Sequence, residues 1–289
     1  MKYISLFAGI GGFDLALNRL GHECVYVNEW DKFAAQTYEK NFKHKLDTRS
    51  ITTVSAEEIP YANLLVGGFP CQSFSIAGKR KGFTETRGTL FFEICRIARA
   101  KRIPYLLLEN VKGLLSHDNG KTFSTIIRSL DGMGYDCQWQ VLNSKNFGVP
   151  QNRERVFIIG HLRGQRRPKV FPITQNGEVF NKSKRQISPT ITARYYKQGQ
   201  SDPYISRFPL KFLQRNQKNI DGDYAFTVDT ANTGGVRIDR MIRKFTPIEC
   251  ERLQGFPDNW TEGVSDSQRY KQCGNAVTVN VVEEIMKRF

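Results

Sequence analysis

The order of elements over the first residues limits most strongly how this chain can fold. Lys2–Leu6 is an apolar run typical of a short strand, and a loop with three glycines, residues 7–13, follows it. Asp14–Leu20 has a helical pattern, and Cys24–Val27 is a second strand that ends close to the carboxylate of Glu29. This is the order of a nucleotide-binding βαβ unit. The glycines match G-x-G-x-x-G imperfectly, so a merely tight turn would explain them almost as well.

Strands and helices continue to alternate up to about residue 160. Apolar runs predict the strands, and apolar side chains three and four residues apart predict the helices. We expect helices over Lys32–Phe42, Leu90–Arg102 and Lys121–Leu130, and strands over Leu64–Val66, Tyr105–Leu108, Tyr135–Leu142 and Arg155–Gly160. Near the end of the chain, a capping box at Thr246 predicts a helix to about Gln254, and a last helix spans Val279–Phe289. The alternation predicts an α/β fold.

Length and composition set further limits. A chain of 289 residues can build one large domain, or one large and one small domain. With 39% hydrophobic and 25% charged residues we expect a soluble globular protein, and no apolar run approaches a membrane span or a secretion signal. The six cysteines lie far apart, which indicates neither a disulfide framework nor a zinc site. We therefore expect no metal, no membrane and a cytoplasmic location.

The net charge of +15 is concentrated in one segment. Residues 161–245 contain 17 Lys and Arg against 6 Asp and Glu, so +11 of the +15 lies there. Aromatic residues such as Tyr195, Tyr196 and Phe208 are interleaved with this charge. A solubilising insertion would have similar charge. Basic side chains for phosphates beside aromatics and amides for bases are more typical of a nucleic-acid-binding lobe.

A Pro-Cys pair follows the apolar run at Leu64–Val66. Two glycines end the strand, and Pro70 gives the next residue a stiff backbone support. That residue, Cys71, is either a nucleophile or a buried structural thiol, and this stretch alone fits both. Residues 73–88 are rich in Ser, Gly, Thr and basic side chains, which favours a loop that closes over an anionic ligand.

Charged side chains also occur where open α/β sheets bind ligands. Glu109 follows the strand that begins at Tyr105, and the carboxyl ends of such strands face the ligand. Arg153 and Arg155 stand on alternate positions, so they point the same way from an extended segment. Ordinary surface arginines would show the same spacing.

Together these motifs resemble the DNA cytosine-5 methyltransferases, in particular the compact bacterial kind of restriction–modification systems. The resemblance covers nearly the whole chain. It rests on eight segments in order, namely residues 7–12 (FAGIGG), 28–31 (NEWD), 68–72 (GFPCQ), 87–90 (RGTL), 109–111 (ENV), 151–155 (QNRER), 252–257 (RLQGFP) and 274–277 (GNAV). It implies a doubly wound, mostly parallel sheet of the S-adenosylmethionine-dependent (Rossmann-like) type, with a smaller irregular, β-rich target-recognition domain. The implied boundaries are 1–165 with 265–289 for catalysis, 166–245 for target recognition and 246–264 for a hinge.

The resemblance assigns catalytic residues by position. Cys71 would be the nucleophile that adds to C6 of cytosine. Glu109 would hold or protonate N3, and we expect burial to raise its pKa for that purpose. Arg155 would contact the O2 side of the ring, and Arg153 would order the pocket and a phosphate. C5 then takes a methyl group from S-adenosylmethionine, and loss of the C5 proton and of Cys71 leaves 5-methylcytosine and S-adenosylhomocysteine.

The resemblance also implies the cofactor residues. Glu29 would accept from the ribose hydroxyls, Trp30 would pack on the adenine, and Asp47 would accept from the adenine amino group. The sequence Leu46-Asp47-Thr48 departs here from the more usual Gly-Asp-aliphatic. The implied set is Phe7, Ala8, Gly9, Ile10, Gly11, Gly12, Glu29, Trp30, Asp47, Thr48, Pro70, Leu90, Asn275 and Ala276.

DNA contacts are implied because a stacked cytosine hides C5 and C6, so the base must rotate into the pocket. A Thr followed by an aliphatic residue supports the flipped nucleotide in relatives. We assign this role to Thr227-Val228, with Thr190-Ile191 as a second candidate. The implied DNA-binding residues are Gln72, Ser75, Ala77, Gly78, Thr227 and Val228.

Three other functions compete with this interpretation. The same fold could methylate RNA, although the RNA-directed branch has a Cys-Phe-Thr element that this chain lacks. A catalytically silent DNA-binding regulator would not need Cys71, Glu109 and the glycine loop. A nicotinamide-dependent oxidoreductase would leave the Pro-Cys loop and the basic segment unexplained. We expect a monomer that acts on double-stranded DNA. A cognate restriction endonuclease that acts on the same sequence is a further candidate partner, which need not form a complex with it.

Overall fold

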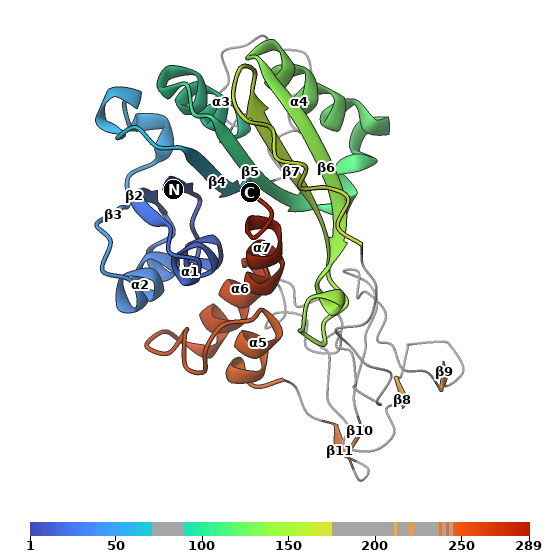
Figure 1. Cartoon of the computed structure of the whole chain (residues 1–289). Coiled ribbons are helices and arrows are strands. Elements are labelled where there is room, and N and C mark those ends of the chain that lie inside the picture. The colour runs from blue at the N-terminus through green and yellow to red at the C-terminus, as the bar shows by residue number, and fades with distance from the viewer. Residues whose placement is uncertain (71–89, 175–210, 213–219, 222–236, 239–240, 243–244) are drawn as a thin grey trace.

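The computed structural model describes residues 1–70, 90–174 and 245–289, together with four two-residue strands between residues 211 and 242. At its centre is a seven-stranded sheet of order β3-β2-β1-β4-β5-β7-β6 (Figure 1). Its strands are β1 (Lys2–Leu6), β2 (Glu23–Asn28), β3 (Leu46–Asp47), β4 (Leu64–Gly68), β5 (Tyr105–Val111), β6 (Tyr135–Asn143) and β7 (Glu154–Leu162). Neighbours from β3 to β5 pair in parallel, whereas β7 runs antiparallel to β5 and β6. The predicted α/β, mostly parallel sheet is confirmed.

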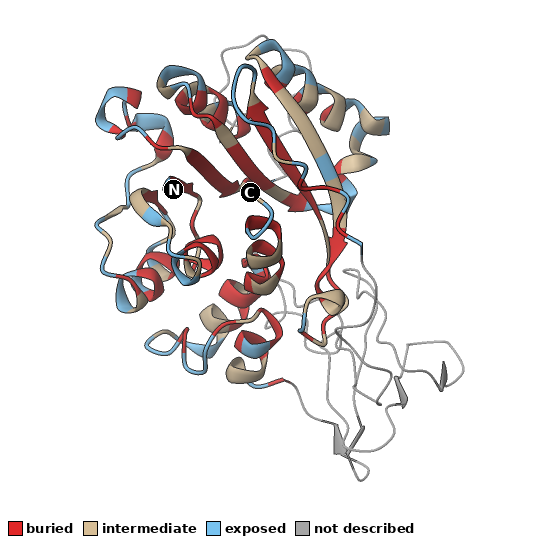
Figure 2. Cartoon of the chain, viewed as in Figure 1, coloured by how far each residue is buried: buried red, intermediate tan, exposed pale blue. Residues whose placement is uncertain are grey.

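Helices cover both faces of the sheet, so the fold is doubly wound as predicted. One apolar core includes residues of α1 (Gly12–Arg19), α2 (Lys32–Asn41) and α7 (Val279–Met286), and the other includes residues of α3 (Leu90–Lys101) and α4 (Lys121–Gly132). Successive residues of a strand alternate between these cores, since Tyr3 belongs to the first and Ile4 to the second. The central strands are therefore buried on both faces (Figure 2).

Element ends differ from the sequence prediction by a few residues, and the backbone explains several of them. Helix α3 ends one residue early because Arg102 takes a φ of 49°, which leaves the helical region. Helix α2 begins where predicted, since Asp31 Oδ1 accepts from the amides of Phe33 (3.0 Å) and Ala34 (3.2 Å). The last helix ends at Met286 and not at Phe289.

The C-terminal region contains a helix that the sequence analysis did not predict. Helix α5 (Pro247–Leu253) begins at the predicted capping box, in which Thr246 Oγ1 accepts from the Glu249 amide (3.3 Å) and Glu249 Oε2 accepts from the Thr246 amide (2.7 Å). Helix α6 (Asp266–Asn275) follows. Its sequence is strongly polar and buries only a narrow stripe, which leaves little hydrophobic periodicity to detect.

Two short antiparallel pairs lie within the basic segment. They are β8 (Lys211–Phe212) with β9 (Ile220–Asp221), and β10 (Arg237–Ile238) with β11 (Met241–Ile242). The remaining residues between 175 and 244 lie outside the described part, so the boundaries of the target-recognition domain stay a prediction. None of the helices described has the length and apolar character needed to cross a membrane.

Candidate active site

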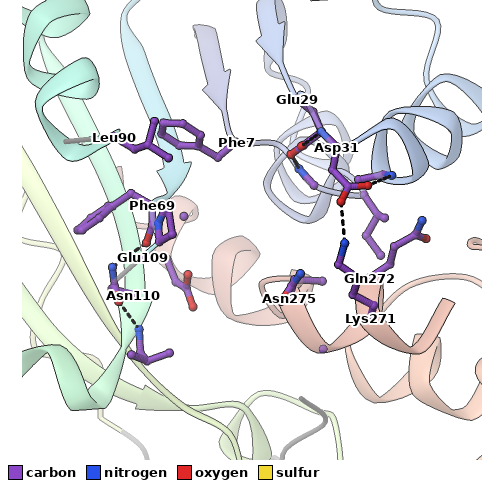
Figure 3. Close-up of a pocket in the computed structure, with 18 of the residues that line it drawn as sticks. Phe7, Glu29, Asp31, Phe69, Leu90, Glu109, Asn110, Lys271, Gln272 and Asn275 are labelled. Carbon is purple, nitrogen blue, oxygen red and sulfur yellow. Dashed lines mark hydrogen bonds and ion pairs between the residues drawn. The ribbon is translucent and has the colours of Figure 1, made fainter. Parts of the chain in front are cut away.

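A cavity of about 390 Å³ lies at the carboxyl ends of the central strands, where open α/β sheets bind their ligands. One wall follows the loops after β1 and β2, a second follows the ends of β4 and β5, and helix α6 forms a third (Figure 3). The predicted site residues that line it are Phe7, Gly9, Ile10, Glu29, Trp30, Pro70, Leu90, Glu109, Arg153, Arg155, Asn275 and Ala276. The fold therefore gathers most of the described candidates around one space.

Glu29 forms the polar centre of the first wall. Its side chain is buried, Oε2 accepts from the amide of Gly9 (2.8 Å), and Oε1 accepts from the amide of Asp31 (2.7 Å). Burial raises the pKa of Glu29, while the two backbone amides oppose that rise. The carboxylate thus fixes the glycine loop against the start of α2. Trp30, in the same wall, exposes 72% of its surface and offers a flat apolar face beside Glu29.

The glycine loop is shaped by packing beneath it. Gly11 has a φ of 84°, and a Cβ there would lie 2.2 Å from Cε2 of Phe42, so the position requires glycine. Phe7 takes a φ of 56°, a strained conformation for a non-glycine residue, and it lines the cavity. Ala8, Gly11 and Gly12 do not line the cavity; their described positions support the loop that does.

Helix α6 contributes residues that the sequence analysis missed. Lys271 Nζ lies 2.7 Å from Asp31 Oδ2, which joins α6 to the N-cap of α2 across the cavity mouth (Figure 3). Gln272 is buried, donates to the Phe33 carbonyl (2.8 Å) and accepts from Thr37 Oγ1 (2.9 Å). Gln268 also lines this wall. The sequence of α6 shows little amphipathic periodicity. The residues of α2 and its N-cap that it contacts lie more than 230 residues away in the sequence, so no local pattern predicts these contacts.

Glu109 forms the polar centre of the second wall. It lies in β5 with 13% of its side chain exposed, and Oε1 is 3.0 Å from Nε of Arg155 on the neighbouring strand β7. Burial raises the pKa of Glu109, as predicted, and the Arg155 and Arg153 guanidiniums oppose that rise. A Cβ on Gly68 would lie 3.0 Å from Glu109 Oε2, so glycine at the end of β4 leaves room for the carboxylate.

Asn110 ties the end of β4 to the same strand. This residue is buried, its Nδ2 donates to the Phe69 carbonyl (2.8 Å), and its Oδ1 accepts from the Val111 amide (2.8 Å). The bond fixes the backbone that leads into Pro70, which lines the cavity directly before Cys71.

Arg153 and Arg155 both line the cavity, which agrees with their alternate spacing, but they have different partners. Arg153 is 1% exposed, and its Nη2 donates to the carbonyls of Gly274 (3.0 Å) and Ala276 (2.8 Å). A guanidinium suits this place because the last carbonyls of a helix carry partial negative charge. Arg153 thus holds the end of α6 against the sheet, while Arg155 faces Glu109.

Several predicted residues are placed elsewhere or lie outside the described residues. Asp47 does not line the cavity; its Oδ2 accepts from Tyr26 OH (3.0 Å) and from Arg49 Nη2 (2.7 Å), and neighbouring Thr48 is also outside the lining. The contact of Asp47 with adenine stays a prediction. Cys71, Gln72, Ser75, Ala77, Gly78, Thr190, Ile191, Thr227 and Val228 lie outside the part of the chain that the structure describes.

Comparisons with known proteins agree with this geometry. The family model described as C-5 cytosine-specific DNA methylase matches residues 1–202 and 173–289. Type II methyltransferase M.Bsp6I of Bacillus sp. (strain RFL6) is 38% identical over 305 residues, covering 99% of this chain and 97% of that protein. Type II methyltransferase M.HhaI of Haemophilus parahaemolyticus is 38% identical over 304 residues, covering 99% and 93%. The solved Dnmt2 methyltransferase of S. pombe matches with a TM-score of 0.71 over 99% of this chain and 97% of that one; at 21% identity this likeness concerns the fold.

Proposed function

Because this chain belongs to the C-5 cytosine-specific DNA methylase family, we propose that it methylates C5 of a cytosine rotated out of double-stranded DNA, with Cys71 as nucleophile. One observation carries this assignment. A largely buried carboxylate and a guanidinium, Glu109 and Arg155, face the same cavity as the Glu29 wall, and Pro70, the residue before Cys71 in the sequence, lines that cavity.

The reaction follows from these groups. The Cys71 thiolate adds to C6, and the displaced ring electrons are accepted at N3, where Glu109 donates its proton. The electron density gained at C5 takes up the methyl group. A base then removes the C5 proton, the C6–S bond breaks, the thiolate leaves and N3 returns its proton to Glu109. The raised pKa of Glu109 supports this role because only the protonated acid can donate at N3.

The Glu29 wall fits S-adenosylmethionine, which supplies an electrophilic methyl group when bound. A buried carboxylate suits the two ribose hydroxyls, an exposed indole at Trp30 suits the adenine, and the neutral loop around Gly9 suits a donor that has no pyrophosphate. Leu90 and Asn275 would close the remaining sides. Asp47 and Thr48 would contact the adenine only if the bond network around Asp47 reorganises.

The basic segment is proposed to hold the DNA. Residues 161–245 carry +11 of the net charge of +15, which suits contacts to several phosphates, so affinity should fall steeply with salt. Within it, Thr227-Val228 would support the flipped nucleotide. Gln72 and residues 73–88, which include Ser75, Ala77 and Gly78, would close over the base. The names of the curated relatives favour a modification enzyme of a type II restriction–modification system. A monomer in a bacterial cytoplasm is part of the same proposal.

Covalent trapping tests the proposal. A duplex with 5-fluorocytosine at the target cannot release the C5 substituent, so wild-type protein with S-adenosylmethionine should remain bound to it on a denaturing gel. Cys71→Ala should give no adduct and no methylation while still binding DNA, whereas Cys137→Ser, a matched half-buried thiol outside the cavity, should behave as wild type. Adduct formation by Cys71→Ala would remove Cys71 from the mechanism, and methylation of structured RNA in place of duplex DNA would favour the RNA-directed alternative.

A further inference from the structure

Three metal-ligating side chains from separate segments meet on the far side of the glycine loop. They are Asp14 of α1, Cys24 of β2 and His44, which follows α2, and one donor atom of each lies within 4.8 Å of the other two. None of the three lines the cofactor cavity. Their spacing in the sequence matches no metal motif; the fold alone brings them together.

Asp14 gives this cluster its charge. The residue is fully buried, Oδ2 accepts from Ser5 Oγ (2.8 Å) and Oδ1 accepts from Tyr3 OH (3.2 Å). Among the described residues, no Lys or Arg forms an ion pair with it. Burying a carboxylate without a cation is costly. A bound cation would offset this cost.

Cys24 and His44 supply softer donors. Both are half-buried. Cys24 Sγ lies 3.6 Å from the Tyr26 carbonyl, and His44 Nδ1 is 3.1 Å from Tyr38 OH. Thiolate, imidazole and carboxylate together form a donor set typical of zinc.

We propose that Asp14, Cys24 and His44 bind one Zn²⁺-class divalent ion, with solvent as the fourth ligand. Zinc bonds of about 2.0–2.3 Å place tetrahedral donors about 3.3–3.8 Å apart, so the side chains need to close by about 1 Å. The thiol releases its proton when the bond to the ion forms.

The ion would stabilise the cofactor-binding half of the sheet. Helix α1 starts directly after Gly11, β2 leads to Glu29, and Phe42, two residues before His44, packs against Gly11. An ion that joins these three segments therefore crosslinks the support of the glycine loop. The proposal does not depend on the proposed methylation, because none of its ligands belongs to the catalytic site.

Cobalt absorbance and thermal unfolding test the site in the full-length, untagged chain. A Cys71→Ser background removes the proposed nucleophile as a competing thiolate ligand. Titration with Co²⁺ should then give a thiolate-to-cobalt charge-transfer band that saturates at one ion per chain. Cys24→Ser should abolish the band, His44→Asn should weaken binding at least tenfold, and Cys137→Ser should keep the wild-type band. Zn²⁺ at a hundredfold excess over Kd should raise Tm by about 5 °C in the background protein and leave Tm of Cys24→Ser unchanged.

A band that persists in Cys24→Ser, or one lost in Cys137→Ser, would assign the metal to other thiols and overturn the site. No band and no shift of Tm would mean that the cluster is a hydrogen-bonded network only. Covalent trapping on 5-fluorocytosine DNA is measured separately, so failure of the metal site and failure of the proposed function give different results.

Discussion

Glu29 and Glu109 are two carboxylates that line one cavity, and they are held in opposite ways. Glu29 follows β2 and accepts from two backbone amides, those of Gly9 and Asp31 (2.8 and 2.7 Å). Glu109 lies in β5 and faces a side chain, the guanidinium of Arg155 at 3.0 Å. Burial raises the pKa of both acids, so desolvation alone does not distinguish them.

The two carboxylates differ in the kind of hydrogen-bond donor that holds them. Backbone amides are neutral, fixed donors, and they keep the Glu29 carboxylate an acceptor in one orientation. Such a group suits recognition of hydroxyls. Arg155 is a side-chain cation, and a turn of its guanidinium from the carboxylate to a ring oxygen would free Glu109 to take or give a proton. Under the proposed function, the first wall would bind the methyl donor, and the second would change protonation state.

The largest effect should come from Glu109→Gln. The amide is nearly isosteric and can still donate a hydrogen bond, but it cannot transfer a proton to N3. Loss of a general acid lowers kcat by about 10²–10⁴. Because the first wall is untouched, KM for S-adenosylmethionine should change less than about threefold. Steady-state kinetics on duplex DNA checks both, and a large rise of the donor KM with unchanged kcat would place Glu109 in binding.

Glu29→Gln should produce the reverse pattern. An amide nitrogen would replace one oxygen, face a backbone N–H and leave that donor unsatisfied, at a cost of about 1–3 kcal/mol. The donor KM should therefore rise about tenfold to a hundredfold, while kcat at saturating donor stays within about twofold. Direct calorimetric titration with S-adenosylhomocysteine should show the same loss of affinity. A fall in kcat comparable to that of Glu109→Gln would contradict the assignment of binding to the first wall and proton transfer to the second.

The pH profile offers a third comparison. If protonated Glu109 is the acid, kcat should fall as pH rises through its raised pKa, by about tenfold for each pH unit beyond it. The Cys71 thiolate should limit the rate on the acidic side. Glu109→Gln cannot titrate, so its profile should lose the alkaline fall and keep the acidic one. Glu29→Gln should keep both, and an unchanged alkaline fall in Glu109→Gln would assign that titration to another group.

The two walls also differ in how far the sequence could predict them. Glu29 and Glu109 were predictable because each follows an apolar strand in an alternating pattern, and strand ends of such sheets meet at one edge. The pairing of Arg155 with Glu109 fits the alternate spacing of the two arginines. The partners of Arg153 were not predictable, since the carbonyls of Gly274 and Ala276 belong to a segment over 120 residues away.

The third wall, helix α6, shows most clearly what the sequence could not predict. Helix α6 has a polar sequence and buries only a narrow stripe, so hydrophobic periodicity could not reveal it, and Lys271 reaches Asp31 across 240 residues. Asp14, Cys24 and His44 escaped notice for the same reason. Contacts of this kind depend on how elements far apart in the sequence pack, and the local spacing of residues carries no signal for them.

The smallest effect should come from Lys271→Met, which breaks the ion pair between the first wall and α6. Partial burial would raise the pKa of Asp31, but Lys271 and the helix amides lower it below its usual value, so the Asp31 carboxylate is charged at neutral pH. The Lys271 and Asp31 side chains are 41% and 34% exposed, and such pairs contribute about 0–1 kcal/mol. The donor KM should therefore rise by at most about fivefold, with kcat unchanged.

The effect of losing the Lys271–Asp31 ion pair can be distinguished from a general effect of removing a lysine. The donor KM is compared at several salt concentrations and in a matched variant. Raising the salt concentration should move the wild-type donor KM toward that of Lys271→Met, because a half-exposed pair is screened. Lys271→Arg should retain most of the affinity. Lys40→Met also breaks an exposed pair between α2 and the C-terminal region, with Glu262 at 3.4 Å, but Lys40 does not line the cavity. If Lys40→Met raised the donor KM as much as Lys271→Met, loosening of the C-terminal helices would explain both rises. The Lys271–Asp31 contact would then have no part in donor binding.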